Sequence, residues 1–196
     1  MHSPGLKVVM PSCAADFKGL LKSALRENNP VLFFVDMPLT MQEGDVPEGE
    51  HLAPIGKAAV LRKGRDVTLV SYGKTVQTCL DAANALQERG IAAEVIDLRS
   101  LKPFDEHSIL ASARKTGRVI VVHEASRLCG VGAEIAALVS EHAFDALQAP
   151  VKRITGPDAP APSSYALEQA FVPQAPTVVS TAMELMKSAR REAALA

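Results

Sequence analysis

Near-continuous apolar runs, each only a few residues long, alternate with segments of helical periodicity along most of this chain. The apolar runs are predicted strands at Asp66–Ser71, Ala93–Ile96, Arg118–His123 and Val151–Ile154. The intervening segments are predicted helices at Lys74–Arg89, at Asp105–Lys115, from the Gly130–Gly132 turn to about His142, and at Pro176–Arg191. Strands that are apolar on both sides need helices on both faces, so the pattern predicts an α/β fold with a mostly parallel sheet.

A smaller unit precedes this domain. Leu6–Met10 and Val31–Phe34 are predicted strands, and Ser12 is a suitable N-cap for a helix that runs to about Asn28. Two such strands joined by a helix form a β-α-β unit, with a right-handed crossover. Because the unit has so few strands, we expect both strands to have unpaired edges. The unit should then be either disordered or covered in a homo-oligomer.

Two segments have the composition of irregular chain. Residues 36–54 contain five acidic residues, three prolines and neither Lys nor Arg, which predicts a surface linker. Residues 156–176 contain five prolines and are predicted to form an extended arm, with one short helical turn near Ala166–Phe171. The expected division is a partial unit at 1–36, a linker at 37–54 and the larger α/β domain at 55–192.

The balance of charge excludes two classes of partner. Lys and Arg number 21 against 22 Asp and Glu, a net charge of −1, so no global field attracts nucleic acid or an anionic membrane. No apolar run approaches the roughly 20 residues of a membrane-spanning helix, and the N-terminus does not read as a signal peptide. Cys13, Cys79 and Cys129 share no metal-ligand spacing and fit reduced thiols. We therefore expect a cytoplasmic protein.

His123 and Glu124 lie where a predicted buried strand ends, the usual place for functional side chains in a parallel sheet. A histidine–carboxylate pair there could act as a general base. We favour the alternative, a polar pair that closes the strand end, because no third catalytic partner is visible. The glycines at 130 and 132 fit a tight turn better than a phosphate site, because Ile135 stands where the dinucleotide fingerprint needs its last glycine.

Asp97 and Arg99 lie at the end of another predicted strand. In an extended chain, residues two apart lie on one face, so both side chains can leave the sheet edge together. The arginine could bind an anionic partner. A structural ion pair between the two that orders the loop is the interpretation we favour.

Whole stretches of the sequence resemble a known family. They include HSPGLKVVMPSCAADFKGLLKSALRENNPVLFF, GKAAVLRKGRDVTLVSYG, EVIDLRSLKPFD, KTGRVIVVHEA and GVGAEIAALVSEHAFDALQAPVKRITGPDAPAP. In order and nearly without gaps, they are similar to the β subunit of the 2-oxo acid dehydrogenase E1 component, as in the pyruvate, branched-chain and acetoin dehydrogenase complexes. The resemblance implies the last β-α-β unit of a pyrimidine-binding domain, followed by a transketolase-type C-terminal domain.

The resemblance implies thiamine diphosphate and Mg as cofactors of the parent enzyme. The glutamate that activates the thiamine ring in the family matches no residue of this chain, so we assign no catalytic and no cofactor-binding residue here. In several members a potassium ion is held by oxygens of a helix end before a proline. Ala24, Glu27 and Asn29 match that segment and are candidate ligands. A plain polar helix end is the alternative.

The resemblance also implies partners. These are the E1 α subunit, a second β subunit and the peripheral subunit-binding domain of the E2 acyltransferase, with the acidic linker and the proline-rich arm as contact surfaces. The function we expect is subunit assembly and E2 docking in the oxidative decarboxylation of a 2-oxo acid, with no activity from this chain alone. The location would be the cytoplasm, or the mitochondrial matrix in a eukaryote. The alternatives are a stand-alone interaction module, one half of a split E1 β subunit, or the C-terminal domain of a transketolase or deoxyxylulose-phosphate synthase.

Overall fold

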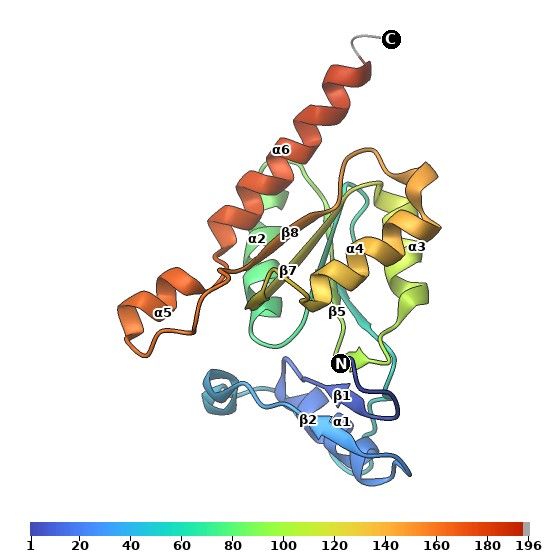
Figure 1. Ribbon diagram of the computed structural model, residues 1–196, viewed down its shortest axis with the longest axis vertical. Coiled ribbons are helices and arrows are strands. Elements are labelled where there is room, and N and C mark those ends of the chain that lie inside the picture. Colours follow the sequence, from blue (N-terminus) through green and yellow to red (C-terminus); the bar gives the residue numbers. More distant parts are fainter. Residues whose placement is uncertain (194–196) are drawn as a thin grey trace.

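The five-stranded sheet forms the centre of the larger domain (Figure 1). The computed structural model describes residues 1–193, with side chains up to residue 187. The strands follow the order β3-β5-β4-β7-β8, and β5, β4, β7 and β8 are parallel to one another. Their bounds are β3 Ala59–Arg62, β4 Val67–Ser71, β5 Ala93–Asp97, β7 Val119–Ser126 and β8 Lys152–Gly156. The predicted mostly parallel α/β sheet is confirmed, whereas the antiparallel edge strand β3 was not predicted.

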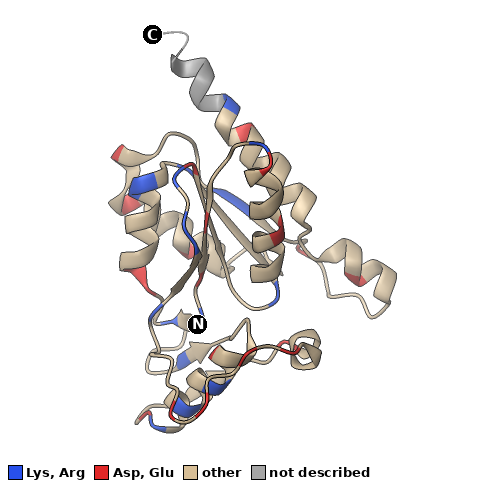
Figure 2. Cartoon of the chain, turned by 180° about the vertical axis from the view of Figure 1, so that it is seen from behind, with Lys and Arg blue, Asp and Glu red and all other residues tan. Residues whose placement is uncertain are grey.

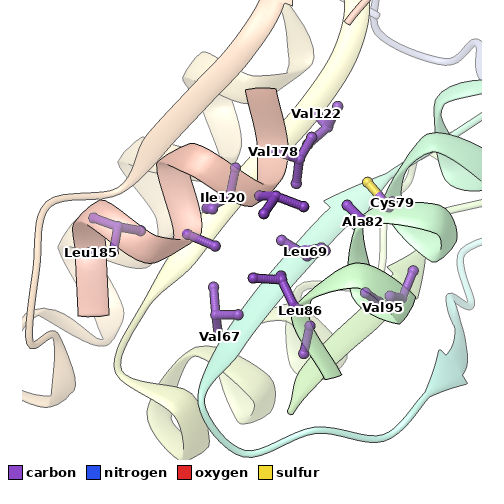
Figure 3. Packing of buried hydrophobic residues seen from close by; sticks show 14 of the residues in the cluster. Val67, Leu69, Cys79, Ala82, Leu86, Val95, Ile120, Val122, Val178 and Leu185 are labelled. Carbon is purple, nitrogen blue, oxygen red and sulfur yellow. The ribbon is translucent and has the colours of Figure 1, made fainter. Parts of the chain in front are cut away.

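Helices cover both faces of this sheet, as predicted. Thr75–Gln87 (α2) and Ala175–Ala193 (α6) lie on one face, and Glu106–Thr116 (α3) and Val131–His142 (α4) lie on the other. Successive residues of a strand point to opposite faces, and the core divides accordingly. Leu69 packs toward α2 and α6, while its neighbour Val70 packs toward α3 and α4. Figure 3 shows the first of these clusters, in which each fully buried aliphatic side chain contributes about 1.5–3 kcal/mol.

The N-terminal unit is a β-α-β unit whose sheet is completed from the larger domain. Lys7–Val9 (β1) and Val31–Phe33 (β2) are parallel and are joined by Ala14–Leu25 (α1). Ser100–Lys102 (β6) pairs antiparallel with β1, giving the order β2-β1-β6. The prediction of unpaired edges on both strands is therefore wrong for β1. Of the two strands β1 and β2, only β2 has an edge without a partner strand among the described residues.

The helix α1 begins one residue later than predicted. Its N-cap is Cys13, whose side chain makes no capping hydrogen bond. The prediction that Ser12 caps this helix is wrong, because the Ser12 hydroxyl donates to the carboxylate of Asp97 at the end of β5 instead. The start of the helix is thus fixed by a contact with the larger domain. By contrast, Asp105 caps α3 as predicted and accepts the N–H of Ser108.

The acidic linker runs along the basic side of α1. Lys18, Lys22 and Arg26 recur every four residues, so they lie on one side of the helix. The Lys18 ammonium donates to the Pro47 carbonyl, and Glu50 pairs with Arg26 at 2.5 Å and with Lys22 at 3.6 Å. Figure 2 shows basic and acidic segments side by side in this unit. Met37–Met41 (η1), a 3-10 helix, forms the first turn of the linker.

The linker also contacts α1 closely at Gly19. Ala53 is almost fully buried, and its carbonyl accepts the hydroxyl of Ser23 at 2.7 Å. A Cβ added at Gly19 would lie 2.8 Å from the Ala53 nitrogen. The absence of a side chain at this helix position therefore allows the linker backbone to approach the helix.

Substitution of Gly19 by alanine should destabilise the chain. Alanine in a helix interior gains about 1 kcal/mol over glycine, but overpacking against fixed backbone costs about 1–3 kcal/mol. We expect a net loss of about 1 kcal/mol in the free energy of unfolding, measured by urea denaturation. Gly44→Ala is the matched control, because its Cβ would meet only Ala14, at 3.6 Å. A Gly19→Ala variant that is more stable than the parent would contradict the close contact.

The proline-rich arm contains the short helix that the sequence predicts. This helix is Tyr165–Phe171 (α5). Its N-cap is Ser164, whose hydroxyl accepts the N–H of Leu167. Figure 1 shows α5 projecting from the body of the domain. A short 3-10 helix, Phe144–Ala146 (η2), follows α4. Among the described residues, no helix is both long and apolar enough to cross a membrane.

Candidate functional site at the carboxyl edge of the large sheet

The carboxyl ends of β4, β5 and β7 face the N-terminal unit. In open α/β sheets this edge is where ligands usually bind. Here the N-terminal unit contacts part of it directly. The Met10 N–H donates to the Arg99 carbonyl at 2.8 Å, and Met10 also packs so closely on Gly73 that a Cβ there would come within 2.8 Å of its methyl carbon. The edge is therefore partly an interface between two units of the same chain.

Asp97 is fully buried at this interface. Its carboxylate accepts the Ser12 hydroxyl from the N-terminal unit and the backbone N–H of Arg99 at 3.0 Å. Burial raises the pKa of Asp97 to about 7, against the lowering effect of these two hydrogen bonds. The side chain thus joins the two units rather than facing a ligand.

Arg99 also joins the two units, but not through Asp97. Its guanidinium pairs with Asp16 of α1 at 3.0 Å and donates to the carbonyls of Lys57 at 2.9 Å and Ala58 at 3.3 Å. The predicted ion pair between Asp97 and Arg99 is therefore wrong. The reason is the backbone, because Arg99 adopts a left-handed φ of 56° and the chain is not extended there.

His123 is fully buried and points into the Gly130–Gly132 turn. Its Nε2 accepts the Gly132 N–H at 3.1 Å, and its ring stacks on Tyr72 with centroids 5.8 Å apart. Burial and the nearby charge of Arg153 lower the pKa of His123, which agrees with a ring nitrogen that accepts a hydrogen bond. Within the described part of the chain, Nδ1 has no hydrogen-bond partner.

The glycine turn is shaped to fit this imidazole. A Cβ at Gly130 would lie 2.9 Å from Cε1 of His123, and one at Gly132 would lie 2.7 Å from its Nε2. The Gly132 N–H, which a phosphate would need, already donates to His123. The geometry therefore favours the tight-turn interpretation, and this turn does not fit the diphosphate of thiamine diphosphate.

Glu124 makes no pair with its neighbour His123 and instead binds Lys74, at 2.8 Å. The Lys74 ammonium lies 3.8 Å from Glu168 of α5, and the Lys74 N–H donates to Asp36 at 3.2 Å. Burial and the charge of Glu124 raise the pKa of Asp36. Sequence reasoning missed Lys74, although it lies just after β4 at the same sheet edge and the strand-end argument applies to it equally.

The candidate potassium ligands are engaged within the chain. The Glu27 carboxylate pairs with the Lys7 ammonium, and the Ala24 carbonyl accepts the Glu27 N–H at 3.2 Å. Asn29 is exposed. A potassium ion on Glu27 would meet the like charge of Lys7, so these three residues do not fit the ion as they are placed, and the polar helix end is favoured.

Comparison with known proteins agrees with this architecture. Residues 56–178 match the family model described as transketolase, C-terminal domain. The chain is 49% identical over 183 residues to the acetoin:2,6-dichlorophenolindophenol oxidoreductase subunit β of Bacillus subtilis, covering 93% of this chain and 54% of that protein. It is 46% identical to the mitochondrial pyruvate dehydrogenase E1 component subunit β of Dictyostelium discoideum, covering 91% and 51%.

A solved structure is similar over nearly the whole chain. The split-gene transketolase, described as an inactive β4 tetramer, superposes with a TM-score of 0.80 at 30% identity, covering 95% of this chain and 59% of that one. The chain spans about half the length of the curated relatives it matches. Its relatives include β subunits of an acetoin:2,6-dichlorophenolindophenol oxidoreductase and of a pyruvate dehydrogenase E1 component, and the chain itself belongs to the transketolase C-terminal domain family.

Proposed function

We propose that this chain acts as part of the β subunit of a thiamine-diphosphate-dependent 2-oxo acid dehydrogenase E1 component. Its role there is subunit assembly and E2 docking in the oxidative decarboxylation of a 2-oxo acid, rather than bond-making. The observation that carries the proposal is the similarity to such β subunits over more than nine-tenths of the chain, at 43–49% identity. The engagement of Asp97, Arg99 and Glu124 in contacts within the chain supports a structural role.

The partners of this role are the E1 α subunit, a second β chain and the small binding domain of E2, in the cytoplasm or the mitochondrial matrix. We assign the E2 contact to the arm at 156–176 rather than to the linker. Glu50 of the linker is already paired with Lys22 and Arg26, whereas Tyr165 and Leu167 of α5 are exposed. Exposed aromatic and aliphatic side chains are the usual anchors of a docking surface.

One half of a split β subunit is the second candidate. The likeness to a split-gene transketolase over 95% of this chain favours it. In that case the missing half would be supplied by another polypeptide, and the pair together would bind thiamine diphosphate. A stand-alone interaction module is the third candidate function.

Analytical ultracentrifugation of the purified chain tests the assembly role. We expect self-association of the chain alone, and no release of carbon dioxide from pyruvate or 2-oxoisovalerate with thiamine diphosphate and magnesium. A stable complex with the matching E1 α subunit that binds thiamine diphosphate would favour the split enzyme. Decarboxylation by the purified chain alone, or monomeric behaviour both with and without the α subunit, would overturn the proposal.

A further inference from the structure

A pocket of about 560 Å³ lies between the N-terminal unit, the carboxyl edge of the large sheet and the proline-rich arm. Its walls are mainly apolar and come from all three parts of the chain. They include Met10 and Phe34 from the N-terminal unit, Leu101 from β6, and Phe171 and Val172 from the arm. The size lies within the range of small-molecule sites, which typically combine apolar walls with a few convergent polar groups.

Tyr72 supplies the first of these polar groups. The side chain lines the pocket and is only 6% exposed. Its ring is held by stacking on His123, yet its hydroxyl makes no hydrogen bond with any described residue of the chain. Because Tyr72 lines the pocket, its hydroxyl can accept and donate hydrogen bonds with a molecule that enters it.

The charged side chains beside Tyr72 determine which charge a bound molecule should carry. Lys74, Glu124 and Glu168 all line the pocket, and Asp36 lies against Lys74. Met1 also lines the pocket and carries the terminal ammonium group. With every group ionised, three carboxylates and two ammonium groups leave a net charge of −1. The Lys74 ammonium is already shared by two carboxylates, at 2.8 and 3.8 Å. A carboxylate or phosphate would meet repulsion here, whereas a cation would be attracted.

We propose that this pocket binds a small primary amine with an apolar body. The ammonium group would donate to the Tyr72 hydroxyl oxygen and to the carboxylates of Glu124 or Glu168. The apolar body would pack against Phe34 and Phe171. The proposal does not depend on the proposed assembly function, since it uses only residues of this chain, although the arm that forms one wall of the pocket is also the segment to which we assign the E2 contact.

Three probes of equal chain length test the proposal on the full chain at pH 7.5: n-hexylamine, 1-hexanol and hexanoate. Binding is followed by isothermal titration calorimetry and by chemical-shift changes of residues around Tyr72. We expect hexylamine to bind at least 10-fold more tightly than hexanol, and hexanoate to bind most weakly. Similar affinities for hexylamine and hexanol would overturn the proposal, because the cavity would then be selecting apolar chains without regard to charge.

Two variants and their matched controls locate the site. Tyr72→Phe should weaken hexylamine binding about 2- to 12-fold, the equivalent of one lost hydrogen bond of about 0.5–1.5 kcal/mol. Glu168→Gln, at a position that is half exposed and therefore tolerant of change, should weaken it about 2- to 5-fold. The exposed Tyr165→Phe and Glu184→Gln should leave binding unchanged. Binding that neither Tyr72→Phe nor Glu168→Gln weakens would place the amine elsewhere and refute the assignment.

Discussion

Replacing Arg99 by methionine should lower the free energy of unfolding by about 3 kcal/mol, because it leaves a largely buried carboxylate without its partner. The guanidinium of Arg99 and the carboxylate of Asp16 are only 14% and 11% exposed. Methionine keeps most of the apolar stem but removes the charge. It also removes the donors to the carbonyls of Lys57 and Ala58. Denaturation in urea measures the loss.

Two further variants separate the ion pair from simple packing. Asp16→Asn in the Arg99→Met background should recover about 1 kcal/mol or more, because it neutralises the orphaned carboxylate. Arg89→Met is the matched control, since Arg89 is exposed in the turn after α2 and its guanidinium donates, among the described residues, only to the Ala85 carbonyl of that helix. Its effect should stay within about 0.5 kcal/mol. An Arg99→Met variant as stable as this control would show that the pair does not hold the two units together.

The parts of the fold that could be predicted from the sequence are those whose signal is local. Strands β4, β5 and β7 are buried on both faces over most of their length, so each appears as a mainly apolar run between helices. The start of α3 was equally visible, because the capping acid Asp105 and its partner Ser108 are three residues apart.

The parts that could not be predicted depend on residues far apart in the chain. Strand β6 has only three residues, too few to show a periodicity, and it forms because β1 offers an unpaired edge. Ser12 resembles a helix cap in sequence, yet its hydroxyl binds Asp97, 85 residues away. Local capping preference is worth about 1 kcal/mol, and a charge-assisted hydrogen bond to a buried carboxylate outweighs it.

For the candidate site too, the positions of the residues could be predicted from the sequence, but their partners could not. The strand-end argument brought Asp97, Arg99, His123 and Glu124 to one edge of the sheet, where the structure also places them. It could not predict their partners, because those come from α1, the linker and the arm. Asp16, which pairs with Arg99 across 83 residues, gave no signal beyond being an acid in the first turn of a helix.

Replacing Asp97 by asparagine should change how stability depends on pH, mainly between about pH 4 and pH 7. Burial raises the pKa of Asp97 from 3.8 to about 7, against the hydrogen bonds from Ser12 and Arg99. Across this interval the folded chain holds a proton on Asp97 that the unfolded chain has released. Stability from this group therefore falls as the pH rises through the interval and is constant above it.

The size of the change follows from the shift in the pKa of Asp97. Each unit corresponds to about 1.4 kcal/mol, so the parent should lose about 2–3 kcal/mol relative to Asp97→Asn between pH 5 and pH 8. Because the pKa of His123 is lowered, this group makes stability rise with pH below its ordinary pKa. Because the pKa of Asp36 is raised, that group makes stability fall as the pH rises, as Asp97 does. Both groups remain in the variant, so the difference between the two proteins reports Asp97 alone.

Urea denaturation of both proteins from pH 5 to pH 8 measures this difference, with Asp145→Asn at an exposed position as the matched control. Asparagine has the shape of the protonated acid and can hydrogen-bond both to Ser12 and to the Arg99 N–H, so the contact between the two units is kept. The variant should be the more stable protein at pH 8, and its advantage should shrink toward pH 5. Parallel profiles for parent and variant would mean that Asp97 is ionised throughout, and that the interface accommodates a buried charge through these two hydrogen bonds.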